Sequence, residues 1–566
     1  MAMELFESPV LMSLNYQQRG YNPSHFSPSL KAFLSFHSSS SSTSTSAYGC
    51  CTRSGSSIII SRRLAVTASS SPSTASTIPQ DPASPPHVLG NVVVVGAGPA
   101  GCLMAHYLIR RGFFVHLFER RLALPTCKMN ADNKNEQLYV RGDTRSYTML
   151  LTSRAMKALE GADIQLPHSL LGSLVGSCVH LSEGKMRKFD YSSDPDLQSY
   201  GVSRNAFVAY LQQTLFERDT DHLSTNFGWE LKEIDDTNRL ATFQRSANYI
   251  DDCEGLQQQH EMKVEFDLLV GADGVSSKVR AELLRLDAIQ RAAGNATENL
   301  PLSLKFLQNP EFYKSFHIRP ALAKTSPLYK DHNRVQSWPS LNMLLVGMAD
   351  GSFWGGSKKA DLLNASSASE VETLFKGNAP EVYDLLLKEN PNFAEDFLKQ
   401  PAISFGGAVL LSRFHHKNVL LIGDAAHSMF PSYGTGCNVA LEDCLLFDQI
   451  LQESKPVHGK FPLRPAAAEF TRRRLCDAHA IVEMNTNFML FPRGFLGYLQ
   501  MLFLTTLRKW FPAVIKPTSY QLLWSTVPFE KIRHQKHKEI FLFYTALLLT
   551  STLVVLIALS ILQVLH

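Results

Sequence analysis

C-x-x-C cysteine pairs and metal-ligand spacings are missing from this chain of 566 residues. The nine cysteines include no C-x-x-C pair and no cysteine–histidine spacing typical of zinc sites, so the sequence predicts neither a metal ion nor a disulfide framework. The formal net charge is only +4, and no basic stripe is interleaved with aromatic residues, so we expect no nucleic-acid partner. The length exceeds that of one hydrophobic core and predicts two domains with extensions.

Acidic residues are nearly absent from the first 86 positions, where only Glu4, Glu7 and Asp81 occur. Seventeen serines fall between positions 35 and 76, and a few arginines are scattered among them. This composition is typical of an organelle transit peptide, which we place at residues 1–68, and it favours a chloroplast over a mitochondrion. A plain disordered tail has the same composition and is the alternative.

Formal charge is absent from the 26 residues at 540–565. As a helix this run exceeds the roughly 30 Å of a hydrocarbon core, which predicts a single membrane span and a lipid bilayer as partner. The basic residues 531–538 on its N-terminal side place the rest of the chain on the cytosolic or stromal side. A buried core helix is the alternative. The apolar segment 494–511 is expected either at the membrane surface or packed on the body of the protein.

What the sequence does contain is a dinucleotide fingerprint at residues 91–121. A buried valine strand runs into a G-x-G-x-x-G turn and a helix, and a second strand ends in an acidic residue. The glycines let backbone N–H groups approach a pyrophosphate, while the acid binds a ribose hydroxyl and favours FAD or NAD over NADP. The candidate cofactor-binding residues here are Gly96, Gly98, Pro99, Ala100, Gly101, Glu119, Arg120 and Arg121.

Two further signatures follow, each with a buried strand that ends in a glycine–aspartate turn. The first covers residues 266–280, and the second covers residues 418–448 and continues into an apolar helix preceded by glycines. A helix N-terminus of this kind can direct N–H groups at a polar ring edge or a developing anion. The candidate ligand-binding residues in these signatures are Asp273, Gly274, Asp424, Gly436, Cys437 and Asn438.

In this order, the three signatures resemble those of the FAD-dependent aromatic hydroxylases (group A flavoprotein monooxygenases), and within them the kynurenine 3-monooxygenase family. Segment 145–154 and Ser203-Arg204 match as well. The resemblance implies an α/β fold, with a Rossmann-like FAD-binding domain similar to that of para-hydroxybenzoate hydroxylase and a β-sheet substrate domain. It also implies that Arg204 and Asp424 contact the ribityl-pyrophosphate region, and that Cys437 and Asn438 lie beside the isoalloxazine ring.

The implied reaction is a hydroxylation of a small molecule, with NAD(P)H as electron donor and O2 as oxygen donor. Only one complete dinucleotide fingerprint is present, so we expect NAD(P)H to bind without a nucleotide-binding domain of its own. The expected boundaries are a transit peptide at 1–68, a linker at 69–90, FAD-binding parts at 91–175, 203–294 and 413–455, substrate-domain parts at 176–202 and 295–412, a C-terminal helical region at 456–538 and a membrane helix at 540–565.

The substrate side departs from the family pattern. Tyr191 matches the tyrosine that holds the kynurenine carboxylate, but Ser177 stands where the partner arginine is expected. Ser432-Tyr433 replaces a phenylalanine pair, and Ile481 falls near a family tyrosine. Kynurenine is therefore a doubtful substrate. A membrane flavoprotein that reduces or epoxidises an isoprenoid lipid, and a flavin-binding protein with a decayed substrate site, are the alternatives.

Three side chains are candidates for a role near the flavin. Glu442 is expected either to orient a water or substrate group or to be a partly buried helix acid paired with a backbone group or a basic group. Tyr191 is expected either to bind substrate or to pack in a hairpin. His427 is interpreted as a structural, hydrogen-bonding histidine and not as a base or metal ligand. The expected location is an organelle membrane, a chloroplast membrane first and the mitochondrial outer membrane second.

Overall fold

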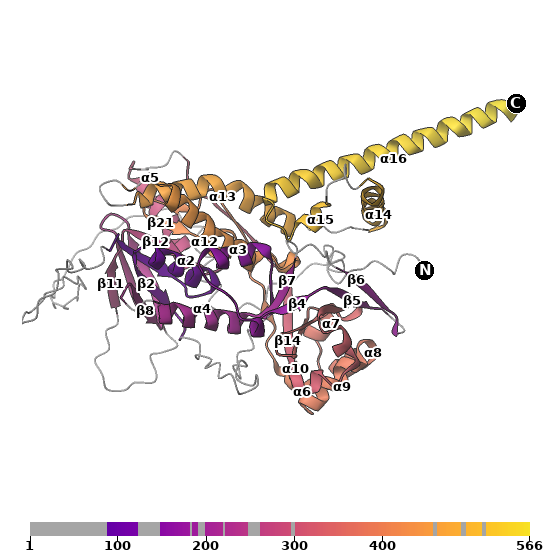
Figure 1. The fold of residues 1–566 in the computed structure, drawn as a ribbon, viewed down its shortest axis with the longest axis horizontal. Coiled ribbons are helices and arrows are strands. Elements are labelled where there is room, and N and C mark those ends of the chain that lie inside the picture. The colour runs from indigo at the N-terminus through magenta and orange to yellow at the C-terminus, as the bar shows by residue number, and fades with distance from the viewer. Residues whose placement is uncertain are drawn as a thin grey trace, which may run out of the picture.

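The computed structural model describes residues 88–122, 148–181, 184–190, 198–218, 221–246, 261–295, 300–454, 456, 461–487, 494–511 and 517–565. The expected transit peptide and most of the linker lie outside the described residues, as does Tyr191. Within the described chain the elements form two sheet-based layers that share one body, and a long C-terminal helix extends away from it (Figure 1).

The first layer is a six-stranded sheet with the order β20-β21-β12-β1-β2-β8. All neighbouring strands are parallel except β20 and β21. Residues 92–94 of β1 are fully buried, which explains the uninterrupted valine run, because a central parallel strand is covered on both faces. The strand bounds are β1 Asn91–Val95, β2 Phe114–Glu119, β8 Leu223–Phe227, β12 Leu268–Gly271, β20 His415–His416 and β21 Val419–Leu421.

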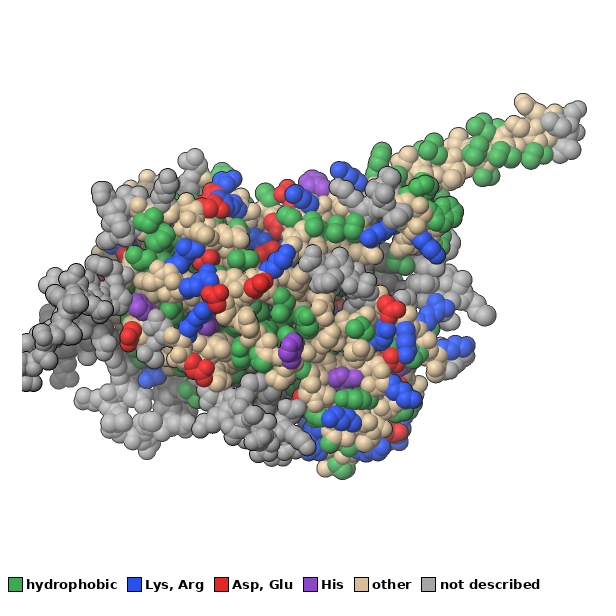
Figure 2. Space-filling view, viewed as in Figure 1, with side chains coloured by type: hydrophobic (Ala, Val, Ile, Leu, Met, Phe, Trp, Pro, Cys, Tyr) green, Lys and Arg blue, Asp and Glu red, His purple; other side chains and the backbone are tan. Residues whose placement is uncertain are grey.

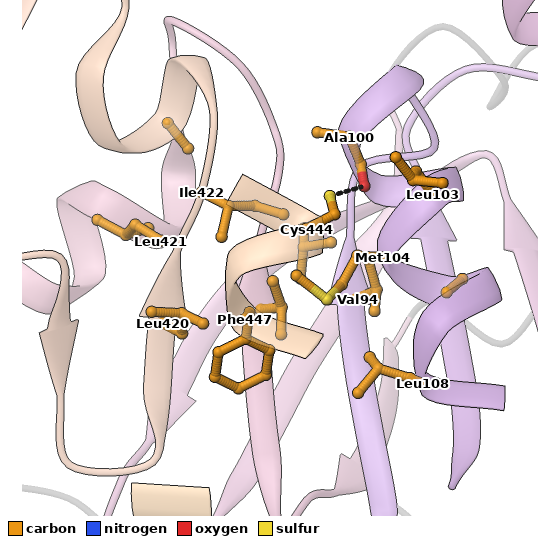
Figure 3. Close-up of a cluster of buried hydrophobic side chains, with 14 of the residues drawn as sticks. Val94, Ala100, Leu103, Met104, Leu108, Leu420, Leu421, Ile422, Cys444 and Phe447 are labelled. Atoms are coloured by element: carbon orange, nitrogen blue, oxygen red, sulfur yellow. Dashed lines mark hydrogen bonds between the residues drawn. The ribbon is translucent and has the colours of Figure 1, made fainter. Parts of the chain in front are cut away.

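The helices α2 and α12 pack together on this sheet (Figure 3). Leu103 and Met104 of α2 and Cys444 and Phe447 of α12 meet the strand residue Val94 in one buried cluster. Helices α3 and α4 extend this layer, and α5 follows β12. The helix bounds are α2 Pro99–Arg110, α3 Ser153–Gly161, α4 Arg204–Arg218, α5 Lys278–Ala292, α11 Asp424–His427, α12 Gly436–Glu453 and α13 Leu463–Thr486.

The second layer is a seven-stranded sheet with the order β18-β14-β17-β16-β15-β5-β6. Strands β5 and β6 come from an early hairpin, and β5 pairs in parallel with β15, more than 150 residues later in the chain. A separate core covers this sheet, built around Trp338, Phe353 and Phe375. The bounds are β5 Gly176–His180, β6 Met186–Asp190, β14 Phe312–Ile318, β15 Arg334–Trp338, β16 Met343–Gly347, β17 Phe353–Ser357, β18 Ile403–Ser404, α6 Pro320–Ala323, α7 Ala360–Leu363, α8 Ala368–Asn378, α9 Pro380–Glu389 and α10 Phe393–Lys399.

Three small sheets complete the body. They are formed by β3, β7 and β4, by β11, β10 and β9, and by β13 and β19. Their bounds are β3 Thr148–Leu151, β4 Gly172–Leu174, β7 Ser199–Ser203, β9 Trp229–Asp235, β10 Leu240–Arg245, β11 Glu261–Glu265, β13 Leu304–Gln308 and β19 Gly407–Leu411. The predicted α/β architecture, a Rossmann-like domain joined to a β-sheet domain, is confirmed.

The C-terminal helix is longer than predicted. Helix α16, Phe529–Leu565, begins eleven residues before the expected start at 540. Phe529 and Ile532 are fully buried against the body, whereas beyond Phe543 every residue whose side chain is described is exposed or half-buried. Among the described helices, only α16 is long and apolar enough to cross a membrane. Its apolar part is the one that projects from the body (Figure 1). The remaining helices are α14 Gly494–Trp510 and α15 Ser519–Leu522.

Candidate functional site

The glycine turn after β1 is shaped by two close backbone approaches. A Cβ on Gly101 would lie 1.7 Å from the carbonyl oxygen of Gly96, because the first turn of α2 packs directly on the end of the strand. Gly96 has a φ of +105°, and a Cβ there would lie 2.5 Å from the carbonyl oxygen of Ala272. The first and second signatures therefore touch, although they lie about 175 residues apart in the chain. This contact is possible only without side chains at both glycines.

The outer side of the same turn is open. A Cβ on Gly98 would meet no described atom within 4 Å, and Pro99 begins α2 immediately after it. The first-turn N–H groups of a helix have no partner within the helix, so they are free to bind an anion. Glu119 stands at the end of β2 and accepts hydrogen bonds from the backbone N–H groups of Ala97 and Arg121, each at 3.0 Å. Arg120 and Arg121 are exposed beside it. These features fit the pyrophosphate and ribose of a dinucleotide.

The carboxylate of Asp273 holds its own loop. Its oxygens accept hydrogen bonds from the Ser277 hydroxyl at 2.5 Å, the Lys278 N–H at 2.7 Å and the Val279 N–H at 3.1 Å. Burial raises the pKa of this carboxyl, with these bonds opposing the shift. Asp273 thus shapes the turn before α5, and the prediction that it contacts a cofactor remains only a prediction. Gly274, next in the turn, has a φ of +80° and open space at its Cβ position.

Asp424 begins α11 at the end of β21 and faces the first turn of α12. Its side chain is accessible to solvent, yet the surrounding protein raises the pKa of its carboxyl, which the positive charges of His427 and Arg204 oppose. A Cβ on Gly436 would lie 4.0 Å from the Asp424 Oδ1. The Arg204 side chain, predicted from a separate motif, lies close enough to Asp424 for its charge to act on this carboxyl.

Cys437 is the second residue of α12 and shares the electrostatic environment of Asp424. Burial and the nearby Asp424 carboxyl raise the pKa of its thiol to about 12. A raised pKa favours the protonated thiol at neutral pH. It presents a small, neutral surface at the helix N-terminus, which suits contact with an aromatic ring system.

The side chain of Asn438 is engaged entirely within the protein. It is fully buried, and its Oδ1 accepts hydrogen bonds from the N–H and hydroxyl of Thr152 at 2.8 and 3.1 Å. Its Nδ2 donates to the carbonyls of Leu150 at 2.8 Å and Gly434 at 3.2 Å. Asn438 therefore ties α12 to β3 and to the loop before α12. Only its backbone N–H lies in the first turn, where a ligand could reach it.

Glu442 is paired with two arginines that the sequence analysis did not connect to it. Its Oε1 binds Arg154 Nη1 at 2.5 Å, and its Oε2 lies 2.8 Å from Arg474 Nη2, an ion-pair distance without hydrogen-bond alignment. The Arg154 guanidinium also stacks over the Phe529 ring at 3.9 Å from its centroid. Of the two readings of Glu442, the geometry supports the paired helix acid. The pair joins α3, α12 and α13 to the base of α16.

Beside this pair lies a second, fully buried carboxylate. Asp443 accepts hydrogen bonds from Arg474 at 2.7 Å, from His427 Nε2 at 2.7 Å and from the Gly423 N–H at 2.8 Å. Burial opposes ionisation of Asp443, but the charges of His427 and Arg474 outweigh it and lower the pKa of the carboxyl. His427 makes the hydrogen bond that a structural histidine is expected to make. Arg474 was missed because nothing near it in the sequence marks it as a partner of residues 442 and 443.

The substrate side is only partly described. Ser177 lies in β5 and pairs with Val335 and Phe189 across the sheet. The nearest arginine in register is Arg334, whose guanidinium is bound to Asp190 at 2.5 Å. Tyr433 is buried and donates a hydrogen bond to the Met484 carbonyl at 3.1 Å. Ile481 packs in the same apolar cluster as Tyr433. Tyr433 and Ile481, which stand where the family pattern has aromatic residues, therefore support the loop before α12.

The Glu442→Gln variant tests this assignment. Because the carboxylate neutralises two buried guanidinium groups, the amide should lower the free energy of unfolding by about 2–4 kcal/mol. A group that only supports the fold should leave the bound flavin spectrum and the pH profile of NAD(P)H oxidation unchanged. Thermal unfolding and steady-state kinetics measure the two effects separately. A kinetic loss without a loss of stability would instead support the catalytic reading.

Comparison with known proteins shows which proteins this chain is similar to. A family model described as FAD binding domain matches residues 405–454, and one described as NAD(P)-binding Rossmann-like domain matches residues 94–136. Kynurenine 3-monooxygenase from Yarrowia lipolytica is 28% identical over 69% of this chain and 79% of its own length. That from Flavobacterium psychrophilum is 26% identical over 70% of this chain and 79% of its own length. The chain is an FAD-dependent monooxygenase that is similar to kynurenine 3-monooxygenases.

Solved structures agree with this monooxygenase in fold. A variant of 2-methyl-3-hydroxypyridine-5-carboxylic acid oxygenase superposes with a TM-score of 0.50 at 16% identity, over 78% of this chain and 98% of its own. Klebsiella pneumoniae HpxO complexed with FAD and uric acid superposes with a TM-score of 0.50 at 15% identity, over 79% of this chain and 96% of its own. The matches to the FAD-binding and NAD(P)-binding family models indicate that the monooxygenase uses FAD and NAD(P)H. Within its described residues, no group of three or more potential ligands is arranged to hold a metal ion.

Proposed function

We propose that this monooxygenase hydroxylates an aromatic or similarly conjugated small molecule at the N-terminus of α12. The observation that carries the proposal is the convergence of three distant segments at the carboxyl ends of β1, β12 and β21. There the open turn at Gly98, the Asp424 carboxyl with Arg204 near it, and the first turn of α12 meet. Open α/β sheets bind ligands at this edge, where the strand order reverses.

The cofactor would be held by backbone more than by side chains. Gly96, Gly98, Gly101 and the first turn of α2 would bind its pyrophosphate, and Glu119 its adenosine ribose. Arg204 and Asp424 would contact the ribityl side, and the first turn of α12 would present N–H groups to the ring. Bound FAD supplies electron transfer from NAD(P)H and the transfer of one oxygen atom of O2 to the substrate. The protein's own part is to orient the ring and to exclude water from it.

Two features separate the expected substrate from kynurenine. Ser177 offers no guanidinium for a carboxylate, and Arg334, its neighbour in register, is already bound to Asp190. Removing a charged partner from a buried carboxylate costs several kcal/mol, roughly 2–5. A substrate without a carboxylate is therefore favoured. The second candidate, a reductase or epoxidase acting on an isoprenoid lipid, is favoured by the same serine together with the projecting apolar part of α16.

We place the enzyme on a membrane through α16, with its body on the cytosolic or stromal side. The exposed apolar part, from about residue 544, is the span, and the buried part, 529–543, holds the body close to the lipid surface. The serine-rich leader favours a chloroplast membrane, with the mitochondrial outer membrane second.

The function is tested with purified full-length protein supplied with NADPH and 18O2 and a metabolite panel. One atom of the label is expected in a hydroxylated product, together with substrate-stimulated NADPH oxidation. An epoxide would indicate the second candidate, and turnover without oxygen would indicate a reductase. Peroxide as the sole product across the panel would count against both.

Arg204→Ala should weaken FAD binding about 10- to 100-fold, because a charged hydrogen bond to the cofactor is worth about 1.5–3 kcal/mol. Arg218→Ala, at the opposite end of α4, removes an arginine that binds the Ala162 carbonyl at 2.7 Å and should leave flavin affinity unchanged. Titration of the apoprotein with FAD measures both. Equal affinity in the two variants would exclude Arg204 from the cofactor site.

A further inference from the structure

Helix α14 is an apolar helix packed at the base of α16. Its 17 residues contain no acidic residue, and its only formal charges are Arg508 and Lys509 in the last turn. Leu504 is buried, and the Phe503 ring lies 5.9 Å from that of Phe543 in α16. The sequence of this segment fits either packing on the body or a position at a membrane surface. The contacts attach it to α16.

The rest of α14 is not covered by the described chain. Its exposed apolar side chains include Trp510 at 72% and Phe511, just after the helix, at 52% exposure. Exposed side chains also occur earlier on the helix, at Leu496, Met501 and Leu502. These apolar side chains share the exposed face of the helix with Thr505, Thr506 and Lys509. Exposed apolar surface of this kind marks an interaction site. A face that combines apolar side chains with a basic one is found in helices that bind anionic lipid surfaces.

This surface is continuous with the projecting part of α16. Phe543 is the last buried residue of α16, and Phe541, Leu542 and Tyr544 around it are exposed. Helix α14 therefore meets α16 at the level where the exposed apolar helix begins. In Figure 2 hydrophobic side chains gather at the base of the projecting helix, with basic side chains beside them.

Helix α14 is too short to be a second span. With a rise of 1.5 Å per residue, its 17 residues give a length of about 26 Å, short of the roughly 30 Å hydrocarbon core. It lies beside the base of the projecting helix α16 (Figure 1).

We infer that α14 is an interfacial helix that lies in the boundary between lipid headgroups and acyl chains. Its side chains Leu496, Met501, Leu502, Trp510 and Phe511 enter the acyl region, and Lys509 reaches the phosphates. Tryptophan is preferred at this depth, because its ring is apolar and its N–H is polar. The inference rests on the proposed membrane attachment through α16. It adds a second contact, which fixes the rotation of the catalytic body about α16.

The test uses the full-length flavoprotein in vesicles of phosphatidylcholine and phosphatidylglycerol. Some of the acyl chains carry bromine near the headgroup and quench nearby tryptophan fluorescence. Quenching is expected for the wild-type protein, and Trp510→Phe should lose at least half of the quenched emission. Equal quenching in both proteins would overturn the inference, because Trp510 would then lie away from lipid.

A second variant separates lipid contact from other occupants. Leu502→Glu should reduce the quenching of Trp510 while vesicle flotation persists through α16. The reference is Leu374→Glu, a partly buried position of α8 in the other sheet domain, which should leave the quenching unchanged. If the chain cross-links as a dimer that Leu502→Glu abolishes, and Trp510 is not quenched, the surface binds a second copy and the inference fails. Flavin absorbance and NADPH oxidation are recorded in parallel, so that failure of the proposed function is distinguished from failure of the lipid contact.

Discussion

Gly101→Ala is expected to yield a protein that neither folds stably nor retains FAD. The added Cβ would lie 1.7 Å from the Gly96 carbonyl oxygen, and the backbone of a buried strand cannot move aside without breaking its pairing with β2 and β12. Overpacking in a core costs about 1–3 kcal/mol, and a clash with backbone at this distance lies at or above the upper end. Soluble yield, thermal unfolding and flavin content measure the loss.

Two other glycine variants separate the steric cause from the loss of a glycine itself. Gly98→Ala places its Cβ in open space, so the apoprotein should keep its stability, while FAD affinity falls because the methyl group enters the expected pyrophosphate position. Gly377→Ala, on the outer helix α8, also meets open space and should change neither property. If Gly101→Ala behaves like Gly377→Ala, the tight contact between α2 and β1 is wrong.

Asp443→Ala should be the second severe variant. It leaves the buried side chains of Arg474 and His427 without the carboxylate that they bind. It also removes the acceptor of the Gly423 N–H. Breaking a buried ion pair by removing one partner costs about 3–5 kcal/mol. The matched control is Glu469→Ala in the same helix as Arg474. It removes a partly exposed partner of Arg472 and Arg473, and should cost no more than about 1 kcal/mol. Denaturant unfolding at neutral pH measures both.

The lowered pKa of Asp443 predicts that the stability of the fold depends on pH in the acid range. Since the folded-state pKa of Asp443 lies below its unfolded value of about 3.9, its contribution to stability is present above that pH and is lost as the pH falls through the folded-state pKa. Asp443→Ala should therefore show a flatter loss of stability below about pH 4 than the wild-type protein. If the variant and the wild-type protein lose stability equally as the pH falls, the ionised carboxylate does not stabilise the fold.

The cofactor end was largely predictable from the sequence. Strand, glycine turn, helix and terminal acid all lie within about 30 residues at 91–121, and each glycine reports a local backbone requirement that any fold with this contact must meet. The apolar run at 540–565 was recognised for a similar reason, because composition alone decides whether a helix can lie in lipid. The helix that contains this run begins earlier, at Phe529, and its first turns, which are polar in sequence, are buried by contact with α13 and with Arg154 of α3.

The roles of the acidic side chains depended on tertiary structure. Glu442 read equally well as a catalytic group and as a paired acid, and only the folded chain brings Arg154 and Arg474 against it from 288 and 32 residues away. The role of a carboxylate depends on the charged groups within about 4 Å of it, and the packing of helices determines which groups these are. The sequence by itself therefore determined that the chain holds a flavin and carries a long apolar helix, because those properties reside in local backbone and composition. Which acids stabilise the fold and which face the ligand was decided by the packing of α3, α12 and α13, because these helices bring together residues far apart in the chain.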